Sequence, residues 1–367
     1  MVGITRRDFA AAGFSVAALS AAGCASAGPT LGQAARGAGL DFGSAFDREV
    51  LTDRAYGELL TAQCTKLVVE NTLKFDWLRP KGPQADFSHA DRIVNFAKQA
   101  GLPVRATALV WNDWTPPWLD RLSVREVEAT FDRHIEETVG RYRGRIAMWD
   151  VVNEPFFPIQ RRAGGFRQGV WFNALGPAYI ARAFKRAAAA DPGATLILNE
   201  AFCEQDDDWG TEIRPRLLAL TKKLRDDGVK IDGIGFQAHL KPHLPHDYRR
   251  FAEYAQSFAA LGLDIHLTEL DVDDSSFPDE PAARDAKVAA QLESFLTPVL
   301  GVNRLKSITV WHLSDRFSWY LGHEGYKSQV RTAGGNPQRA PRTHLYDQDL
   351  RPKAAWHAVH RALRARA

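Results

Sequence analysis

The amino-acid sequence predicts an α/β protein, folded as a single (β/α)8 TIM barrel. Short apolar runs alternate with longer stretches of helical periodicity, which is typical of repeated βα units. In addition, polar side chains gather at the points where these apolar runs end. In a parallel barrel the carboxyl ends of the strands form one face, so these polar side chains are expected to lie together there.

Eight apolar runs are predicted to be the strands. The chain has no shared repeat and no low-complexity spacer, so a single domain is expected from about residue 39 to residue 363. The eight runs are residues 40–46, 67–70, 103–111, 146–153, 195–199, 233–239, 264–269 and 307–311.

Two of the segments between these runs show a clear helical face. In residues 178–190 the apolar side chains recur at helical spacing until Asp191 and Pro192 end the pattern, and residues 90–101 behave likewise. The segment 321–341 is rich in Gly, Lys, Arg and Gln, and it is predicted to be a long loop after the eighth strand.

The composition indicates a folded protein without a strong electrostatic field. Of the 367 residues, 45% are hydrophobic, which suffices for a large core. The net charge is only +3, so neither nucleic acid nor an anionic membrane is an expected partner, and a neutral polymer fits better. Cys64 and Cys203 are expected to be buried free thiols, because a chain of this size does not need disulfides.

The amino terminus reads as an export signal of the twin-arginine type. Arg6 and Arg7 precede a mildly apolar, alanine-rich run over residues 10–22. This run is too short and too weakly apolar for a stable membrane span. We therefore assign residues 1–29 to the signal and the start of a linker, and residues 30–367 to one domain. A periplasmic or secreted protein is expected, cleaved after Ala27 or carrying a lipid anchor at Cys24.

Two glutamates stand at the ends of two predicted strands. Glu154 ends a valine-rich run that Pro155 closes, and Glu269 ends another run where it meets a loop. Hydrolysis of a glycosidic bond needs such a pair of carboxyl groups, about 5 to 5.5 Å apart if the anomeric configuration is retained and about 6.5 to 9.5 Å apart if it is inverted. One of the two must stay protonated near neutral pH, which requires burial or a neighbouring negative charge.

Further polar residues at the strand ends support such a site. Asn153 is placed to bond a substrate hydroxyl. His239 is expected between Glu269 and Asp271, where an imidazole would orient the nucleophile and keep it ionised. Gln237 and His239 alternate along one run, so both are predicted to point inward. A core histidine is the alternative for His239. Polar residues at strand ends also include Glu70, Asn71, Asn112, Asp113, Asn199, Glu200 and His312.

Other chemistries lack their sequence signatures. No His-Glu-x-x-His or similar ligand spacing occurs, so no catalytic metal is expected. No Gly-x-Ser-x-Gly elbow and no phosphate-binding loop is present either. We expect no cofactor, a β-1,4-linked polysaccharide or oligosaccharide as substrate, and a monomer.

With these residues in hand, the chain resembles glycoside hydrolase family 10 over residues 42–358, a family whose typical activity is retaining endo-1,4-β-xylanase. Residues 149–155 are similar to its acid/base strand and residues 267–271 to its nucleophile strand. The resemblance implies that Glu154 is the general acid/base and Glu269 the nucleophile. It also implies that Gln237 and His239 lie around the nucleophile, and it implies sugar contacts for a further group of residues: Glu70, Asn71, Lys74, Trp111, Trp311 and Trp319.

The chain departs from the family pattern around the point of cleavage. Thr107 and Asn112 stand where the family has histidines, and Ala201 stands where a tyrosine is common on the leaving-group side. His312 replaces a glycine, and Thr72 and Phe75 replace the usual Glu and Trp. The departures leave two alternatives open: a retaining hydrolase of another β-linked glycoside, or a sugar-binding barrel with little turnover. Both glutamates are kept, which favours an enzyme.

Overall fold

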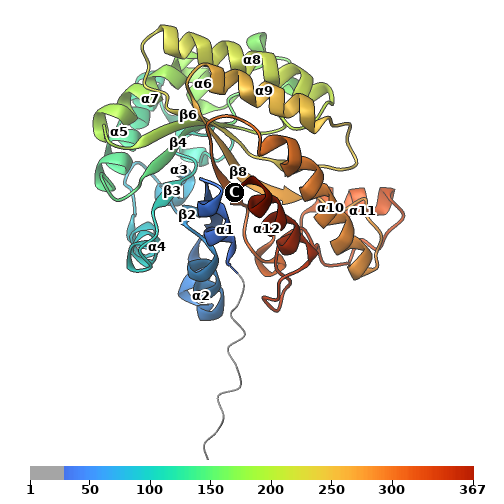
Figure 1. Cartoon of the computed structure of the whole chain (residues 1–367). Coiled ribbons are helices and arrows are strands. Elements are labelled where there is room, and N and C mark those ends of the chain that lie inside the picture. Colours follow the sequence, from blue (N-terminus) through green and yellow to red (C-terminus); the bar gives the residue numbers. More distant parts are fainter. Residues whose placement is uncertain (1–28) are drawn as a thin grey trace, which may run out of the picture.

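The computed structural model describes residues 29–367. The predicted export signal and Cys24 lie outside the described residues. Within the described part, strands form a central barrel and helices surround it (Figure 1). No helix of this part is long and apolar enough to cross a membrane.

Eight parallel strands close into a barrel, which confirms the predicted (β/α)8 fold. From β1 to β6 each strand pairs with the next along the chain; β6 then pairs with β8, β8 with β9, and β9 with β1. The two-residue β7 pairs with the end of β8. The strands are β1 (Asp41–Phe46), β2 (Lys66–Val69), β3 (Val104–Ala106), β4 (Met148–Asn153), β5 (Thr195–Glu200), β6 (Gly233–Phe236), β7 (His239–Leu240), β8 (Asp264–Val272) and β9 (Leu305–Val310).

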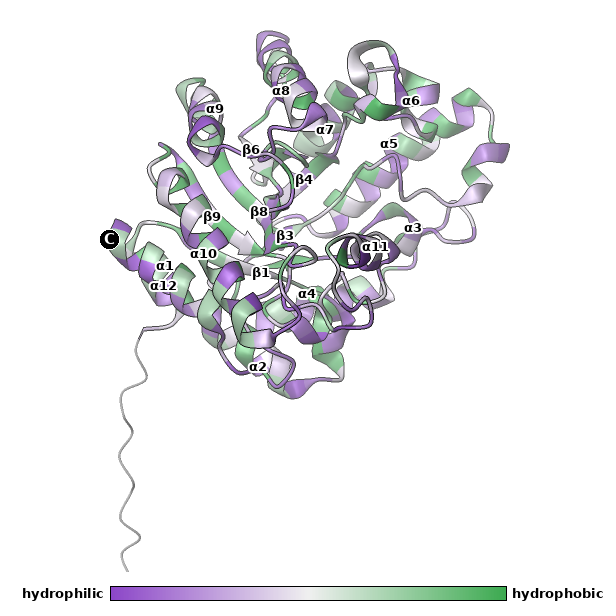
Figure 2. Ribbon diagram, turned by 90° about the vertical axis from the view of Figure 1, so that its right-hand side faces the viewer, coloured by the Kyte–Doolittle hydropathy of each residue, from purple (hydrophilic) through white to green (hydrophobic). Residues whose placement is uncertain are grey.

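Helices connect the strands and cover the outside of the barrel (Figure 1). Figure 2 shows that their hydrophilic residues alternate with hydrophobic ones, as expected of helices with one buried face. Helix α1 lies beside α12, close to the carboxyl terminus. The helices are α1 (Leu31–Gly37), α2 (Arg54–Gln63), α3 (Phe75–Leu78), α4 (Ser88–Gln99), α5 (Val124–Arg141), α6 (Val170–Leu175), α7 (Ala178–Ala190), α8 (Asp208–Asp226), α9 (Tyr248–Ala260), α10 (Pro281–Val299), α11 (Glu324–Thr332) and α12 (Ala354–Arg366).

Helix α7 illustrates how the sequence determines these elements. Ile180, Ala183, Phe184 and Ala187 are all buried on one face, and Asp191 is the C-cap, in an extended conformation. The helix therefore has the bounds that its sequence predicts.

Three predicted elements differ from the structure. The third run ends as a strand at Ala106; beyond it, the backbone contacts β4 through a hydrogen bond from Leu109 to Asp150 and through the bridge between Val110 and Val152. The sixth run is interrupted because Ala238 has a φ of 61°, which a continuous strand does not allow. The segment 321–341 was predicted to be a long loop, but helix α11 forms within it. Helix α11 buries Tyr326 and Val330.

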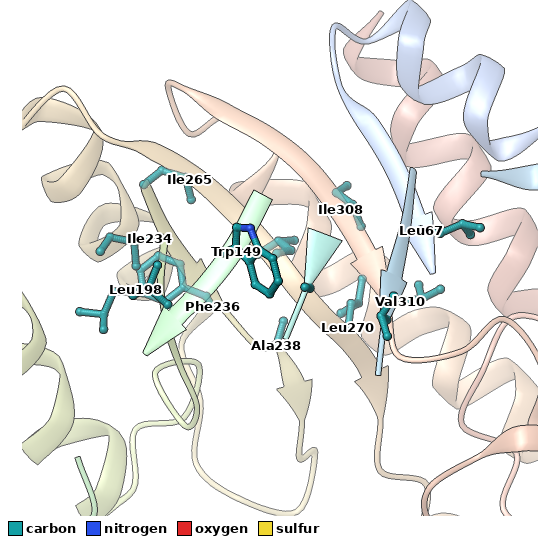
Figure 3. Packing of buried hydrophobic residues seen from close by; sticks show 14 of the residues in the cluster. Leu67, Trp149, Leu198, Ile234, Phe236, Ala238, Ile265, Leu270, Ile308 and Val310 are labelled. Atoms are coloured by element: carbon teal, nitrogen blue, oxygen red, sulfur yellow. The ribbon is translucent and has the colours of Figure 1, made fainter. Parts of the chain in front are cut away.

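The core consists of apolar side chains from the strands and the helices packed on them. Figure 3 shows buried residues such as Trp149, Phe236 and Leu270 at the barrel strands. One polar pair lies among the strands: Arg105 on β3 donates two hydrogen bonds of 2.9 Å to Asp150 on β4. Cys64 and Cys203 are buried free thiols, as predicted.

Candidate active site

A cavity of about 520 Å³ opens where the strands end at their carboxyl side. All the residues predicted to act in catalysis or sugar binding line it, except Asp271, so the carboxyl ends of six of the eight barrel strands and the loops after them contribute side chains. Of the other polar residues at strand ends, Asn112, Asp113, Asn199, Glu200 and His312 do not line it. The predicted residues on its wall are Glu70, Asn71, Lys74, Trp111, Asn153, Glu154, Gln237, His239, Glu269, Trp311 and Trp319.

Glu154 follows β4 directly and has hydrogen-bond donors on both carboxylate oxygens. Gln237 Nε2 donates to Oε1 at 2.7 Å, and Arg167 Nη2 donates to Oε2 at 2.7 Å. Burial raises the pKa of the Glu154 carboxyl above its usual range, while the Arg167 guanidinium opposes this change and the nearby Glu269 adds to it. A buried carboxyl with a raised pKa is suited to carry a proton near neutral pH.

Arg167 is a site residue that the sequence did not reveal. It also donates to the Glu154 carbonyl oxygen at 2.9 Å and bonds Asp113, and its side chain is only 3% exposed. It comes from the irregular loop after β4, where neither periodicity nor a motif distinguishes one arginine from its neighbours. Two further arginines of that loop, Arg161 and Arg162, lie exposed.

Glu269 lies on β8, and its side chain lines the same cavity as that of Glu154. Asn199 Nδ2 donates to Glu269 Oε1 at 2.8 Å and also to Asn153 Oδ1 at 2.9 Å. His239 Nε2 lies 3.3 Å from Glu269 Oε2. An amide and an imidazole thus hold the carboxylate in one orientation.

His239 lies between two carboxylates. Its Nδ1 is 2.9 Å from Asp271 Oδ1, on the side away from Glu269. Burial alone would lower the pKa of His239, but Asp271 and Glu269 outweigh it and raise the pKa to about 10. The ring is therefore an imidazolium at neutral pH, and it carries a positive charge next to Glu269. Asp271 does not line the cavity; it accepts a 2.7 Å hydrogen bond from Trp319 Nε1 behind the wall.

Glu70 and Asn71 follow β2 and mark one end of the cavity. Asn71 accepts a 3.0 Å hydrogen bond from Lys74 Nζ. Glu70 Oε2 lies 3.0 Å from Nε2 of His312, which is buried behind it and does not line the cavity. Burial would raise the pKa of Glu70, yet His312 and Lys74 together lower it, so this carboxyl is an ionised acceptor.

Aromatic rings form much of the wall. Trp111 and Trp114 stack with their ring centroids 5.9 Å apart, and the Lys74 ammonium lies 4.9 Å from the Trp114 ring. Trp114 is 44% exposed, which is unusual for so large an apolar side chain. Nothing in the sequence distinguishes Trp114 from a core tryptophan; only its place at the cavity does.

The residues that depart from the family pattern occupy different places. Thr107 and Ala201 line the cavity, whereas Asn112 does not. Asn112 is buried and accepts a hydrogen bond of 3.2 Å from the backbone of Phe172 at the start of α6, so it has a structural contact. Phe75 packs edge-on against Trp171, with ring centroids 5.0 Å apart, and is likewise outside the cavity lining.

The arrangement can supply a proton donor, an oriented carboxylate and stacking surfaces within one cavity. These are the groups that cleavage of a glycosidic bond needs. Among residues 29–367 no group of three or more His, Cys, Asp or Glu side chains is placed to hold a metal ion.

The comparisons with known proteins agree with this chemistry. The sequence model named Glycosyl hydrolase family 10 matches residues 30–362. An endo-1,4-beta-xylanase A of Phanerodontia chrysosporium is 32% identical over 285 residues, covering 76% of this chain and 67% of that protein. A beta-1,4-xylanase of Dictyoglomus thermophilum is 31% identical over 83% of this chain and 84% of that protein. The crystal structure of xylanase 10B from Thermotoga maritima superposes with a TM-score of 0.77 at 28% identity, covering 92% of this chain and 98% of that one.

Proposed function

Because the chain belongs to glycosyl hydrolase family 10 and is therefore a glycoside hydrolase, we propose that it hydrolyses internal β-1,4-xylosidic bonds in xylan or xylo-oligosaccharides with retention of configuration. Glu154 is the general acid/base in this proposal, and Glu269 is the nucleophile. The relatives named above are xylanases, which supports the choice of substrate.

One observation carries the assignment of roles. The pKa of Glu154 is raised by burial although its carboxylate bonds the Arg167 guanidinium, whereas Glu269 accepts a hydrogen bond from the Asn199 amide and lies 3.3 Å from the imidazole of His239. The two environments therefore differ in the way that two carboxyl groups with different roles require. The asparagine amide and the imidazole hold the Glu269 carboxylate in one orientation, as the role of an attacking nucleophile requires.

The reaction proceeds in two displacements. In the first, a carboxylate oxygen of Glu269 attacks the anomeric carbon, the bond to the glycosidic oxygen breaks, and Glu154 gives its proton to that oxygen. In the second, Glu154 takes a proton from water, the water oxygen attacks the anomeric carbon, and Glu269 leaves as a carboxylate. Glu70, Asn71 and Lys74 hold the glycone sugar.

The proposal is tested by measuring turnover and the anomeric configuration of the first product. The protein is incubated with soluble arabinoxylan and with xylo-oligosaccharides, and proton NMR follows the first anomer released. The β-anomer is expected first, and Glu269→Ala should abolish its release. The control is Glu253→Gln, which changes an exposed glutamate on α9 and should leave turnover unchanged. Release of the α-anomer first would refute retention.

Two other results would replace the proposal. Faster turnover of gluco-oligosaccharides would indicate another β-linked glycoside as the substrate. Tight binding of xylo-oligosaccharides without any product would indicate a sugar-binding barrel. Thr107 and Ala201 are the two departures on the cavity wall that would then account for the change.

Export of the protein is part of the proposal and rests on sequence alone. Residues 1–29 are proposed as the signal and the linker start, and residues 30–367 as the catalytic domain, which is expected to be a monomer in the periplasm or medium. Replacing Arg6 and Arg7 by lysines should retain the protein in the cytoplasm. If Cys24 carries a lipid anchor, the protein should be found in the membrane fraction, and replacing Cys24 should release it. Light scattering of the mature protein should give the mass of one chain.

A further inference from the structure

A wall of the cavity opposite Glu70 carries a lysine in an unusual setting. Phe202 follows β5, Lys241 follows β7, and both line the cavity beside Ala201. In the strand order of the barrel, β2 and β6 are four strands apart, so this wall and the Glu70 end lie across the barrel mouth from each other. Since Glu70 belongs to the glycone end, the wall with Lys241 borders the leaving-group half of the cleft.

The lysine is held in place by aromatic rings. The Lys241 ammonium lies 4.5 Å from the Phe202 ring centroid, a cation–π distance. The Phe202 ring in turn packs edge-on against Trp209 of α8, with centroids 4.6 Å apart. Phe202 has a φ of 61°, a left-handed conformation that is uncommon for a bulky side chain and persists only where the surroundings enforce it. The contact with the Phe202 ring thus restricts the position of the Lys241 ammonium on the cavity wall.

The charge of Lys241 has no direct partner among residues 29–367. Its ammonium forms neither a salt bridge nor a hydrogen bond there. Four carboxylates lie nearby, and all of them have other partners. Three accept hydrogen bonds from backbone N–H groups: Asp207 from Gly210 at 2.9 Å, Asp273 from Ser275 at 2.9 Å and Glu204 from Ala238 at 2.7 Å. The fourth, Asp271, accepts from Trp319 Nε1. Burial lowers the pKa of Lys241, although the charges of these four carboxylates oppose this change.

We infer that Lys241, positioned by Phe202, binds a carboxylate on a sugar in the leaving-group half, so that chains substituted with a uronic acid are preferred over neutral chains. This inference rests on the proposed function. An ammonium on a partly buried wall pairs more strongly with a carboxylate than with a neutral hydroxyl. Ala201 leaves room for a branch, because its side chain is a single methyl group next to Phe202.

A matched pair of substrates separates charge from shape. One is a β-1,4-xylo-oligosaccharide with a single glucuronic acid branch, and the other is its methyl ester, which has nearly the same shape and no charge. We expect kcat/KM to be about tenfold higher for the acid than for the ester at low ionic strength, and this ratio to fall as salt screens the pair. Mass spectrometry of the products should find the branch in the leaving-group fragment.

Three variants test whether Lys241 is the cause. Lys241→Met should bring the ratio of acid to ester close to one, and Lys241→Arg should keep it. Lys287→Met is the control, because Lys287 also lies over an aromatic ring, 5.7 Å from the centroid of Phe277, but is outside the cavity lining. Each ratio compares two substrates on one protein, so a general loss of activity or folding does not affect it.

The outcomes are distinguishable from those of the proposed function. A ratio near one in the unaltered protein, or a ratio that Lys241→Met leaves unchanged, would overturn the inference while xylan hydrolysis stands. If neither oligosaccharide is hydrolysed, the proposed function fails, and calorimetric dissociation constants for the acid and the ester give the ratio instead. Tighter binding of the acid that depends on Lys241 would then still support the carboxylate site.

Discussion

Nη2 of Arg167 lies 2.7 Å from Oε2 of Glu154, so the proposed general acid is paired with a guanidinium. The pair creates a conflict, because the guanidinium favours the ionised carboxylate while burial favours the protonated one. Burial prevails, and the pKa of Glu154 stays above its usual range. Arg167 thus limits how far burial raises this pKa.

Replacing Arg167 should therefore change the pH dependence of the reaction. In Arg167→Met the opposing charge is gone, so the pKa of Glu154 rises further. Because the protonated acid is the active form, activity is lost as pH rises through this pKa, and the basic limb of kcat/KM should move to higher pH. The value of kcat/KM at the optimum should fall roughly tenfold, since a charge-assisted hydrogen bond that orients the carboxyl is lost. A series of rate measurements from acid to alkaline pH shows both effects.

The control for this experiment is Arg162→Met. Arg162 is an exposed arginine of the same loop, and among residues 29–367 its side chain donates a hydrogen bond only to Gln168. Its pH profile should match that of the unaltered protein. Arg167→Lys keeps a positive charge and should give an intermediate profile. An unshifted basic limb in Arg167→Met would mean that the guanidinium does not act on the acid.

His312 should act on the glycone end through Glu70. Carboxylates including Glu70 and Glu49 raise the pKa of His312, against the effect of burial. The imidazolium is present below this raised pKa and is lost as pH rises through it, so its hold on Glu70 weakens at higher pH. His312→Asn should raise KM for xylo-oligosaccharides about tenfold with little change in kcat.

Two observations separate this role from a structural one. The KM of the unaltered protein should rise at the pH where His312 loses its proton, and this inflection should be absent in His312→Asn. His312 has a φ of 75°, a conformation that Asn tolerates well, so the variant should keep its melting temperature. An equal fall in kcat would show instead that the whole site had been distorted.

Trp114 should contribute more to the hydrolysis of long substrates than to that of short ones. Its exposed indole borders the proposed glycone end, where it packs against Trp111 and Lys74, and a sugar ring can stack on it. Trp114→Ala should lower kcat/KM for xylohexaose about tenfold and that for xylotriose by less than about twofold. Ile159→Ala removes another exposed apolar side chain and should change neither. Faster cleavage of xylohexaose by Trp114→Ala would show that the indole blocks the chain.

The sequence could predict the barrel and the two glutamates for a common physical reason. Strands and their ends are determined locally, by apolar runs and by residues such as Pro155 that end them. Parallel pairing then brings the ends to one face, wherever they stand in the chain. The prediction for Gln237 and His239 rested on alternation along one strand; both do line the cavity, although Ala238 interrupts the strand between them.

The residues that the sequence did not predict lie in loops. Arg167 lies thirteen residues after Glu154 in the chain and bonds it from an irregular segment. Trp114 and Lys241 also lie in irregular segments that follow strands. A loop takes its shape from tertiary contacts such as the one between Phe202 and Trp209, and no periodicity in the sequence records such contacts. The third and sixth strands were predicted too long for the same reason.

The buried pair of Arg105 and Asp150 should be essential for stability. Both side chains are almost fully buried, and Arg105 also donates a 3.0 Å hydrogen bond to the carbonyl of Thr268. Asp150→Leu leaves the guanidinium buried without its carboxylate, so the free energy of unfolding should fall by about 3 to 5 kcal/mol. The double variant Arg105→Met with Asp150→Leu should recover most of this loss, because two apolar side chains can replace a buried ion pair at little cost. Urea denaturation of the three proteins measures the difference, and a double variant no more stable than the single one would show that the hydrogen bond to Thr268, not the charge pair, holds these strands together.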